Sequence, residues 1–572
     1  MLDKLVNWWE ALSQWWKQSL TIITQEDYSP LLDTNGFLGI LAFSVAVFTL
    51  SSPKYQIRQA TAIIPFRPFF FGVLIVSGFI IFALEAFVLY GLQIPKFLHP
   101  NAINYLTTSL IALLIFYWMK ICFIRPPRFT RFTAHNFFHQ TYSYIENGSR
   151  EEMLAMAREI MREIPRIVQH MPRRDRFRRE DDEAVKFTTV QAYSNDLLLL
   201  LSDTRFCDAV AEDVPSFPAH LVEQVVRLKR YDAPIHLIIR RIVIALLNKP
   251  GSALHVENEW LGQGLMGEVK PITRAVFSNW HLLESWEAGM ESPLDLGYPQ
   301  AEYWDHETWR VYFELAREYV RGVTKSGHSN WDNRGIRHIL ETTKRAFGDI
   351  GDERMYEDPS SPHNPYWRAR EANDFIKDLV KQFDASNGWL HFDRRDKYYY
   401  GNDLSSKIAS LLSETIFRAS RINTKEFRMW DVQHNLVWSS IEEHEVRNTK
   451  LMKMVRRKVR RMIYDEIRRM DVFPNFKGAG YIRFCLNVLG FYDESVHRRP
   501  GLKQDSWLLA KVISDWVRKN YQTIAKSHPP VAKAMLPANI EYDQASEMLI
   551  REKEDSLTGT SRIKEFPLDP AC

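Results

Sequence analysis

Three apolar runs near the start of the chain constrain its fold more than any other feature. They cover residues 37–50, 69–92 and 103–124, and the second and third each contain one formal charge, Glu85 and Lys120. A helix rises about 1.5 Å per residue, so about 20 apolar residues cross a hydrocarbon layer of about 30 Å. The second and third runs have this length, and we therefore expect both to be transmembrane helices.

The first run is shorter and reaches the length of a span only with help from its surroundings. Leu31, Leu32 and Gly36 precede it and extend it, or the lipid around it is locally thinner. The alternative for the whole region is a buried hairpin of a soluble protein, but soluble helices seldom stay apolar on every face over such lengths. The sequence thus predicts an all-α protein. Three transmembrane helices are followed by a large, mostly α-helical cytosolic domain with at most a small β-hairpin.

Basic residues in the short segments that flank the runs predict their orientation, because cytoplasmic flanks carry an excess of Lys and Arg. Six such residues lie between the first two runs or directly after the third, against two on the opposite side. The six are Lys54, Arg58, Arg67, Arg125, Arg128 and Arg131, and the two are Lys17 and Lys96. We expect a multi-pass inner-membrane protein with its N-terminus outside and its C-terminal domain in the cytoplasm.

The chain begins with a Trp-rich segment that contains Trp8, Trp9, Trp15 and Trp16 in a helical pattern. Trp prefers the membrane interface, so we expect an interfacial helix on the outer surface; a helix packed on a partner protein is the alternative. The predicted organisation is an external helix and linker (1–35), a transmembrane region (36–124), a basic juxtamembrane helix and charged linker (125–183), a helical cytosolic domain (184–550) and a disordered tail (551–572).

Helical periodicity dominates the chain after the apolar runs. Apolar residues spaced by three and four predict a helix over 150–170, with Ser149 as its cap and Glu152 in the capping-box position. Residues 389–392 and 397–400 are candidate strands of a hairpin. Further helices are expected near 186–202, 217–230, 234–248, 306–324, 332–347, 368–385, 403–421, 446–470 and 504–526.

Motifs for catalysis, cofactor binding or metal binding are weak or missing. Residues 262–267 match G-x-G-x-x-G, but a poor strand precedes them and no strand–helix alternation follows, which favours a flexible turn over a dinucleotide site. His135 and His139 share a helix face and fit an aromatic helix better than a metal site. No P-loop, Gly-x-Ser-x-Gly or His-Glu-x-x-His pattern occurs. We expect no catalytic residues, no cofactor and no metal, and we favour a non-enzyme.

The segment 446–470 carries the strongest local charge, with ten basic residues against Asp465 and Glu466 and an apolar stripe in one sector. The simplest interpretation is an ordinary helix with its stripe in a core and its charges in water or paired with acids. Otherwise it contacts anionic lipid, an acidic protein or nucleic acid. Lipid leads these readings because the anchor holds the domain at the membrane, and nucleic acid is not favoured. The candidate contact residues are Lys453, Arg456, Arg457, Arg460 and Arg461.

Glu85 is the second candidate site, because an ionised carboxylate within a span is costly. Thr108 lies at a similar depth in the next span, and Gly78 shares the face of Glu85 and permits close helix approach. In the simpler hypothesis, protonated Glu85 bonds to the Thr108 hydroxyl and holds the bundle together. In the other, Glu85 from several subunits lines a cation or proton path. Glu85 and Thr108 are therefore candidate intramembrane functional residues.

Three classes of function fit these patterns. The favoured class is a membrane-anchored sensor or effector whose helical cytosolic domain binds a partner or ligand and acts at the membrane. The alternatives are an oligomeric ion channel or pore-forming subunit, and a membrane-tethered enzyme without a readable motif. The formal net charge of +4 is too small to identify a partner. The expected partners are the lipid bilayer and either further copies of the chain or another protein.

Overall fold

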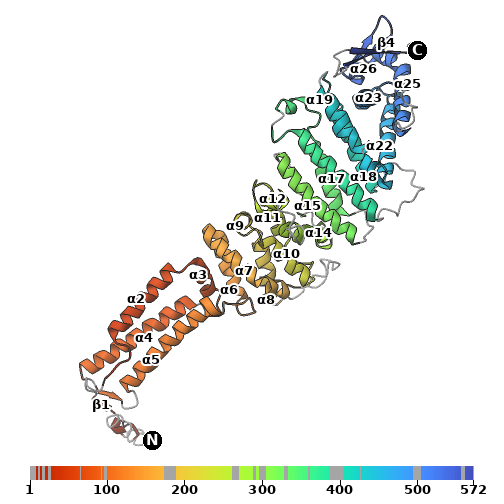
Figure 1. Ribbon diagram of the computed structural model, residues 1–572. Coiled ribbons are helices and arrows are strands. Elements are labelled where there is room, and N and C mark those ends of the chain that lie inside the picture. The colour runs from red at the N-terminus through yellow and green to blue at the C-terminus, as the bar shows by residue number, and fades with distance from the viewer. Residues whose placement is uncertain are drawn as a thin grey trace. The chain divides into compact units, whose positions relative to one another are not determined.

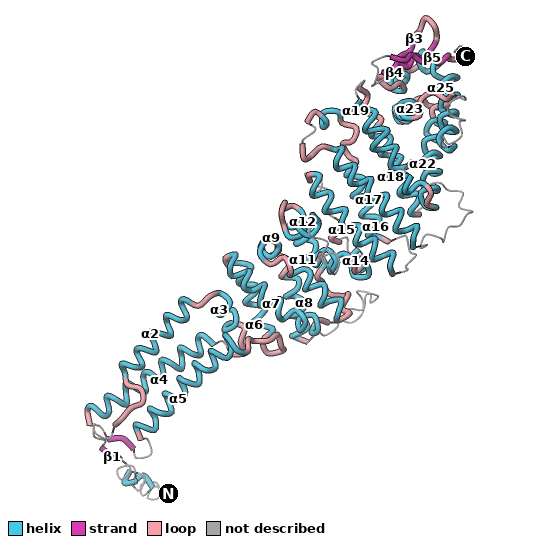
Figure 2. Tube along the Cα trace, in the orientation of Figure 1, coloured by secondary structure: helices cyan, strands magenta, loops and turns pink. Residues whose placement is uncertain are grey.

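The structure is a computed structural model in which helices predominate (Figures 1 and 2). The chain divides into two compact units, residues 1–238 and 239–572, which we describe separately. The predicted all-α class is confirmed, because the strands of the described residues form only one two-stranded pair and one three-stranded sheet. The described residues are 8–10, 13–15, 20–22, 28–64, 66–91, 93–95, 99–172, 188–259, 270–287, 292–295, 304–326, 333–358, 361–386, 403–424, 427–442, 444–493, 504–554 and 561–570.

The first unit begins with a bundle of long apolar helices. Helix α4 (Phe66–Leu89) and the continuous helix Pro100–Ile124 are each long and apolar enough to cross a membrane. The latter consists of α5 (Pro100–Met119) and a π-helical end, η2 (Lys120–Ile124). The part of the chain that the structure describes therefore contains two helices that can each span a membrane.

The first apolar run forms a bent pair rather than a simple span. Helix α2 (Thr34–Leu50) has 17 residues, and Asp33 caps it by accepting a hydrogen bond from the Gly36 N–H. After Leu50 the chain turns by 107° into the short helix α3 (Pro53–Ala60). The count of spans rises to three if this bent pair forms one.

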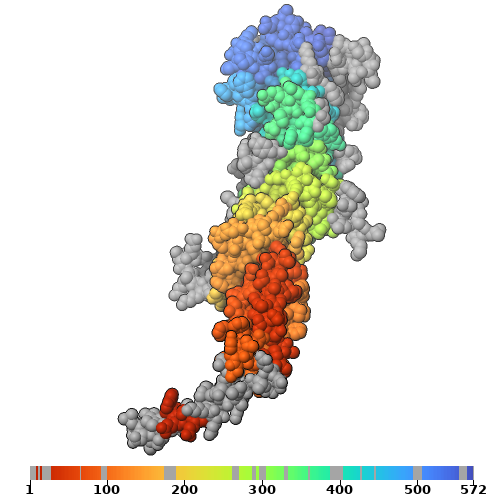
Figure 3. Space-filling view, turned by 90° about the vertical axis from the view of Figure 1, so that its left-hand side faces the viewer, coloured from red at the N-terminus to blue at the C-terminus, as the bar shows by residue number. Residues whose placement is uncertain are grey.

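Aromatic side chains fill the core of the bundle. Phe48 of α2 packs against Phe66 and Phe70 of α4, with ring centroids 6.3 and 5.3 Å apart. Large apolar side chains such as Phe43 and Phe79 instead face outward and are exposed, as expected for a lipid-facing surface. The outer face of α2 is visible in red in the space-filling view (Figure 3).

The expected close approach at Gly78 is present. A Cβ atom built on Gly78 would overlap the ring of Phe37, whereas one built on Gly72 of the same helix would meet nothing within 4 Å. We therefore predict that Gly78→Ala destabilises the bundle by about 1–3 kcal/mol through overpacking. Gly72→Ala is the matched control and should be neutral. Thermal unfolding in detergent measures both, and equal midpoints for the two variants would contradict the contact.

Five further helices complete the first unit. The predicted capping box of α7 (Arg150–His170) is confirmed: Glu152 accepts hydrogen bonds from the Ser149 N–H and hydroxyl, and the Ser149 hydroxyl accepts from the Glu152 N–H. The sequence suggested a domain boundary near residue 183, but the helices on both sides of it pack together. The others are α6 (Ala134–Asn147), α8 (Thr189–Leu200), α9 (Thr204–Asp213) and α10 (Phe217–Arg227).

The second unit is built mainly from long helices packed side by side. Helix α15 (His306–Lys325) packs on α17 (Pro365–Ser386), and α18 (Leu404–Ala419) packs on α22 (Lys450–Arg469). Around them lie α12 (Ala253–Glu259), α13 (Pro271–Phe277), α14 (Trp280–Glu287), α16 (Arg334–Ala346), η4 (Glu353–Tyr356), α19 (Phe427–Trp430), η5 (Asp431–Trp438), α20 (Ser439–Glu442), α21 (His444–Arg447), α23 (Phe476–Val488), α25 (Gln504–Ser527) and α26 (Pro529–Met535). The point at which the chain divides into the two units falls within helix α11 (His236–Leu247).

The expected disordered tail (551–572) is wrong for most of its described residues, because residues 551–554 and 561–567 form strands. β3 (Ile540–Asp543), β4 (Met548–Glu554) and β5 (Ser561–Pro567) make an antiparallel sheet in the order β3-β4-β5. Phe566 stacks on Phe491, which precedes α25, at 4.2 Å. A few isolated apolar residues therefore suffice to pack this sheet, because other parts of the same unit supply the rest of the core.

Two sequence predictions lie outside the described residues: the hairpin at 389–400 and the glycine motif at 262–267. The same holds for Trp16 and for most of the charged segment before residue 188. Of the Trp-rich segment, residues 8–10 and 13–15 are helical, and Trp8, Trp9 and Trp15 are exposed. Its predicted place at the membrane interface stays a prediction.

Candidate functional site

Glu85 lies near the C-terminal end of α4 and joins it to the start of α2. Its carboxylate accepts hydrogen bonds from the Thr34 N–H at 2.8 Å and from the Thr34 hydroxyl at 2.5 Å. Thr34 is the first residue of α2, where unpaired N–H groups and the helix dipole favour a carboxylate. The predicted bond to Thr108 is wrong. The Thr108 hydroxyl is buried and has no hydrogen-bond partner among the described residues.

Asn104 of α5 is the partner of this site that the sequence analysis missed. Its fully buried side-chain oxygen accepts from the N–H groups of Leu31 and Leu32, and its NH₂ donates to the Leu32 carbonyl at 2.8 Å. Because buried amides require hydrogen-bond partners, an Asn within an apolar run was a usable signal. Together, Glu85 and Asn104 fix the chain that leads into α2.

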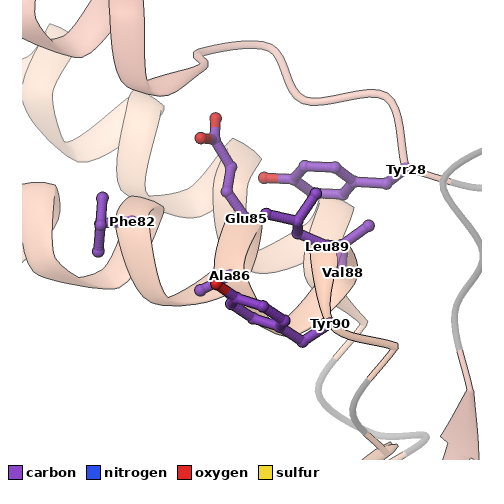
Figure 4. A pocket seen from close by; sticks show the side chains of 7 residues that line it. All are labelled: Tyr28, Phe82, Glu85, Ala86, Val88, Leu89 and Tyr90. Carbon is purple, nitrogen blue, oxygen red and sulfur yellow. The ribbon is translucent and has the colours of Figure 1, made fainter.

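A pocket of 510 Å³ opens beside Glu85. Figure 4 shows the Tyr28 hydroxyl pointing toward the Glu85 side chain from the extended segment before α2. Burial, together with the negative charge of Glu85, raises the pKa of Tyr28. The other lining residues, Phe82, Ala86, Val88, Leu89 and Tyr90, are mostly apolar, so the pocket suits an apolar group with one polar end.

The arrangement around Glu85 predicts how its replacement acts. Glu85→Gln retains an oxygen that accepts from Thr34, so the start of α2 should stay in place with a small loss of stability. Glu85→Leu removes both bonds and should cost about 1–3 kcal/mol, because the Thr34 donors lose their partner. Hydrogen exchange of the first turn of α2 in nanodiscs is the measurement. If Leu leaves this turn as protected as the wild type does, Glu85 does not hold it.

The opposite end of the bundle contains a charged junction. Arg58 of α3 donates from Nε to the Glu159 carboxylate of α7 at 2.9 Å, and its Nη2 lies 2.8 Å from the same oxygen. Its Nη1 donates to the Cys122 carbonyl in η2. The Arg58 and Glu159 side chains are only 11% and 5% exposed, so both charges need compensation. Arg58 obtains it from Glu159, and Glu159 obtains it from Arg58 and Arg162. One guanidinium therefore joins α3, the end of α5 and α7.

Glu163, one turn further along α7, extends the junction. It lies on the same helix face as Glu159 and accepts from the Phe129 N–H at 3.0 Å. Arg162 bridges the two carboxylates, at 2.6 Å from Glu159 and 3.0 Å from Glu163, and Arg166 adds a bond of 2.7 Å to Glu163. The two buried acids of α7 are thus fully compensated by arginines and a backbone N–H.

The predicted basic helix corresponds to α22 and directs part of its charge inward. Arg456 is 3% exposed and forms two hydrogen bonds with Glu442, at 2.9 and 3.1 Å. Arg460 also donates to Glu442, at 3.0 Å. These two candidate contact residues therefore stabilise the interior, because a buried carboxylate requires paired cations.

The remaining candidates on α22 are more exposed. Arg461 pairs with Asp465 one turn away at 2.9 Å, as is usual for a solvated helix face. Lys453 and Arg457 are exposed. A contact of these residues with lipid or nucleic acid stays a prediction.

Lys458 of α22 supports the packing of α18. It donates to Asp403 at 2.7 Å, and Asp403 caps α18 by accepting from the Ser406 N–H. Burial opposes ionisation of Asp403, but the bonds from Lys458, Ser405 and Ser406 outweigh it and hold the pKa of Asp403 below its usual range. This contact adds to the evidence that α22 is a structural helix over much of its surface.

The two histidines of the sequence analysis lie together on α6. The rings of His135 and His139 are 4.2 Å apart, and His135 Nδ1 is 2.7 Å from the Tyr193 hydroxyl on α8. Within the described residues, no group of three or more His, Cys, Asp or Glu side chains is placed to hold a metal ion.

Comparisons with family models, curated proteins and solved structures find no match for this chain.

Proposed function

We propose that this chain is a membrane-anchored helical effector. The bundle of α2, α4 and α5 holds the helical domain at a bilayer, and the junction around Arg58 passes displacements of the bundle to α7. The observation that carries the proposal is the buried Arg58–Glu159 pair, with side chains 11% and 5% exposed. A passive tether requires no such pair, because a flexible linker would hold a domain at the membrane equally well.

The junction supports transmission because it is stiff. Breaking a buried ion pair costs about 3–5 kcal/mol, so α3, η2 and α7 do not separate at thermal energies. Glu163 ties α7 to the chain that leaves the membrane helix, through the Phe129 N–H. Helices α9 and α10 pack on α7, and α6 and α8 pack on each other. A shift of the bundle would therefore displace this helical layer.

The other functional classes have less support. A channel would need Glu85 to face a path between subunits, whereas its carboxylate accepts two bonds from Thr34 of its own chain. The bilayer is the partner for which the two long apolar helices give direct support. A homo-oligomer or a complex with another protein belongs to the proposal, as do the outside N-terminus and the cytoplasmic C-terminal domain.

The orientation is tested by labelling cysteines in intact cells. Ser29 and Ile563 are both exposed and make suitable positions for cysteine. Cys572 should first be replaced by Ser, since the three other cysteines are buried. A membrane-impermeant maleimide should label Ser29→Cys in intact cells and Ile563→Cys only after lysis. The reverse pattern would overturn the orientation.

The coupling is tested by a double-mutant cycle at the junction. Glu159→Gln should destabilise the protein by about 3–5 kcal/mol, because it leaves Arg58 without a counter-charge. Arg58→Met should cost less, because Arg162 still pairs with Glu159, and both variants should raise hydrogen exchange throughout α7. The double variant should lose less stability than the two single variants together, because the interaction between the two side chains is lost only once. The measurements are unfolding in detergent and hydrogen exchange in nanodiscs.

Arg150 provides the matched control on the same helix. It pairs with Glu212 and Asp213, but its side chain is 49% exposed, so Arg150→Gln should change little. If Arg58→Met leaves α7 as protected as Arg150→Gln does, the junction does not couple the bundle to the helical layer, and the proposal fails.

A further inference from the structure

The turn between α22 and α23 exposes three large apolar side chains within five residues. Val472, Phe473 and Phe476 are 89%, 68% and 62% exposed. Single exposed apolar residues are common on soluble surfaces, but a contiguous group that includes two Phe side chains marks an interaction site. We call this group the apolar tip.

The apolar tip is held in a fixed conformation. Asn475 accepts from the Gly478 N–H at 2.8 Å as the cap of α23, and it donates to the Phe473 carbonyl at 2.9 Å. Trp516 of α25 donates to Asp471 at 2.6 Å and ties down the base of the turn. The exposed side chains therefore project from an ordered turn, and their binding would cost little conformational entropy.

Basic residues surround the apolar tip. The side chains of Arg468, Arg469 and Lys477 are 61%, 63% and 50% exposed. They pair with Asp471 and Glu466, but exposed pairs are weak and leave N–H groups free to contact another anion. Apolar side chains among cations are the combination that binds an interface between hydrocarbon and anionic headgroups.

We propose that the apolar tip inserts into the headgroup region of an anionic bilayer and gives the chain a second membrane contact. The proposal rests on the proposed function for one point, that the bundle keeps the second unit close to a membrane. An anionic bilayer fits better than a protein groove, because the tip combines a protruding apolar wedge with a surrounding positive charge. This contact lies at the end of α22, whereas the sequence analysis offered a lipid contact over the middle of this helix only as an alternative to an ordinary structural helix.

The test places a fluorescent probe on the tip of the full-length protein. Val472→Cys, in a background with Cys572→Ser, is labelled with an environment-sensitive dye and reconstituted into phosphatidylcholine vesicles with or without phosphatidylglycerol. We expect a blue shift and quenching by lipid-bound nitroxide with phosphatidylglycerol, both reduced by high salt. Phe473→Ser should lower the inserted fraction roughly tenfold, because it removes a large apolar side chain from the contact.

Leu508 of α25 provides the matched control. It is 54% exposed in the same unit, and Leu508→Ser should leave the signal of the labelled tip unchanged. A loss equal to that of Phe473→Ser would show general adhesion and overturn the proposal. So would a probe that stays in water in both vesicles, or one shielded equally in both without quenching by lipid-bound nitroxide, which would indicate a protein contact. Protein removed from the vesicles by an alkaline wash would contradict the membrane anchor instead.

Discussion

Arg58 places a charge where an apolar bundle ends and a helical layer begins, and the surrounding elements are arranged to compensate it. A buried guanidinium needs both a counter-charge and acceptors for its N–H groups. Glu159 supplies the charge, and the Cys122 carbonyl supplies a further acceptor. A π-helical end is suited to this role, because its wider turn frees carbonyl groups from the regular helix pattern. The position of α7 follows from the need to bring Glu159 within reach.

At the other end of the bundle, the helices are held together by hydrogen bonds from neutral donors, one of whose acceptors is a carboxylate. Inside lipid, apolar side chains gain little by packing on each other rather than on lipid, so helices are held by close contacts and hydrogen bonds. Asn104 and Glu85 supply the bonds, and the Gly78–Phe37 contact supplies the close approach. All three act on α2 or on the segment that leads into it. The helix that is least able to span by itself thus receives the most specific contacts.

Local patterns predicted most of the long helices that the structure describes, because their signals lie within a few residues. The capping box of Ser149 and Glu152 is one example, and the start of α18 near residue 403 is another. The partner of Glu85 could not be found in this way. The sequence shows the depth of Glu85 in its helix, but Thr34 reaches it only because α2 packs against α4. The same limit explains Arg456, whose burial depends on a glutamate fourteen residues earlier.

The strands of the tail were missed because sequence composition gives only a weak indication of them. Leu549 and Phe566 lie opposite each other in the sheet and are both buried, but only Phe566 lies within the tail that was expected to be disordered (551–572). The ring partner of Phe566, Phe491, is distant in the chain, and composition alone therefore indicated disorder.

The 107° corner between α2 and α3 makes these two helices an L-shaped lever. If α2 moves along its own axis, α3 moves in the same direction, which is nearly perpendicular to the axis of α3. Arg58 lies on α3, so the movement would reach Glu159 and α7 through the buried ion pair. A change in bilayer thickness, including the thinning that tension causes, would act along the direction of a spanning helix. The corner would present the whole length of α3 to such a displacement, at the level where the bundle meets α7.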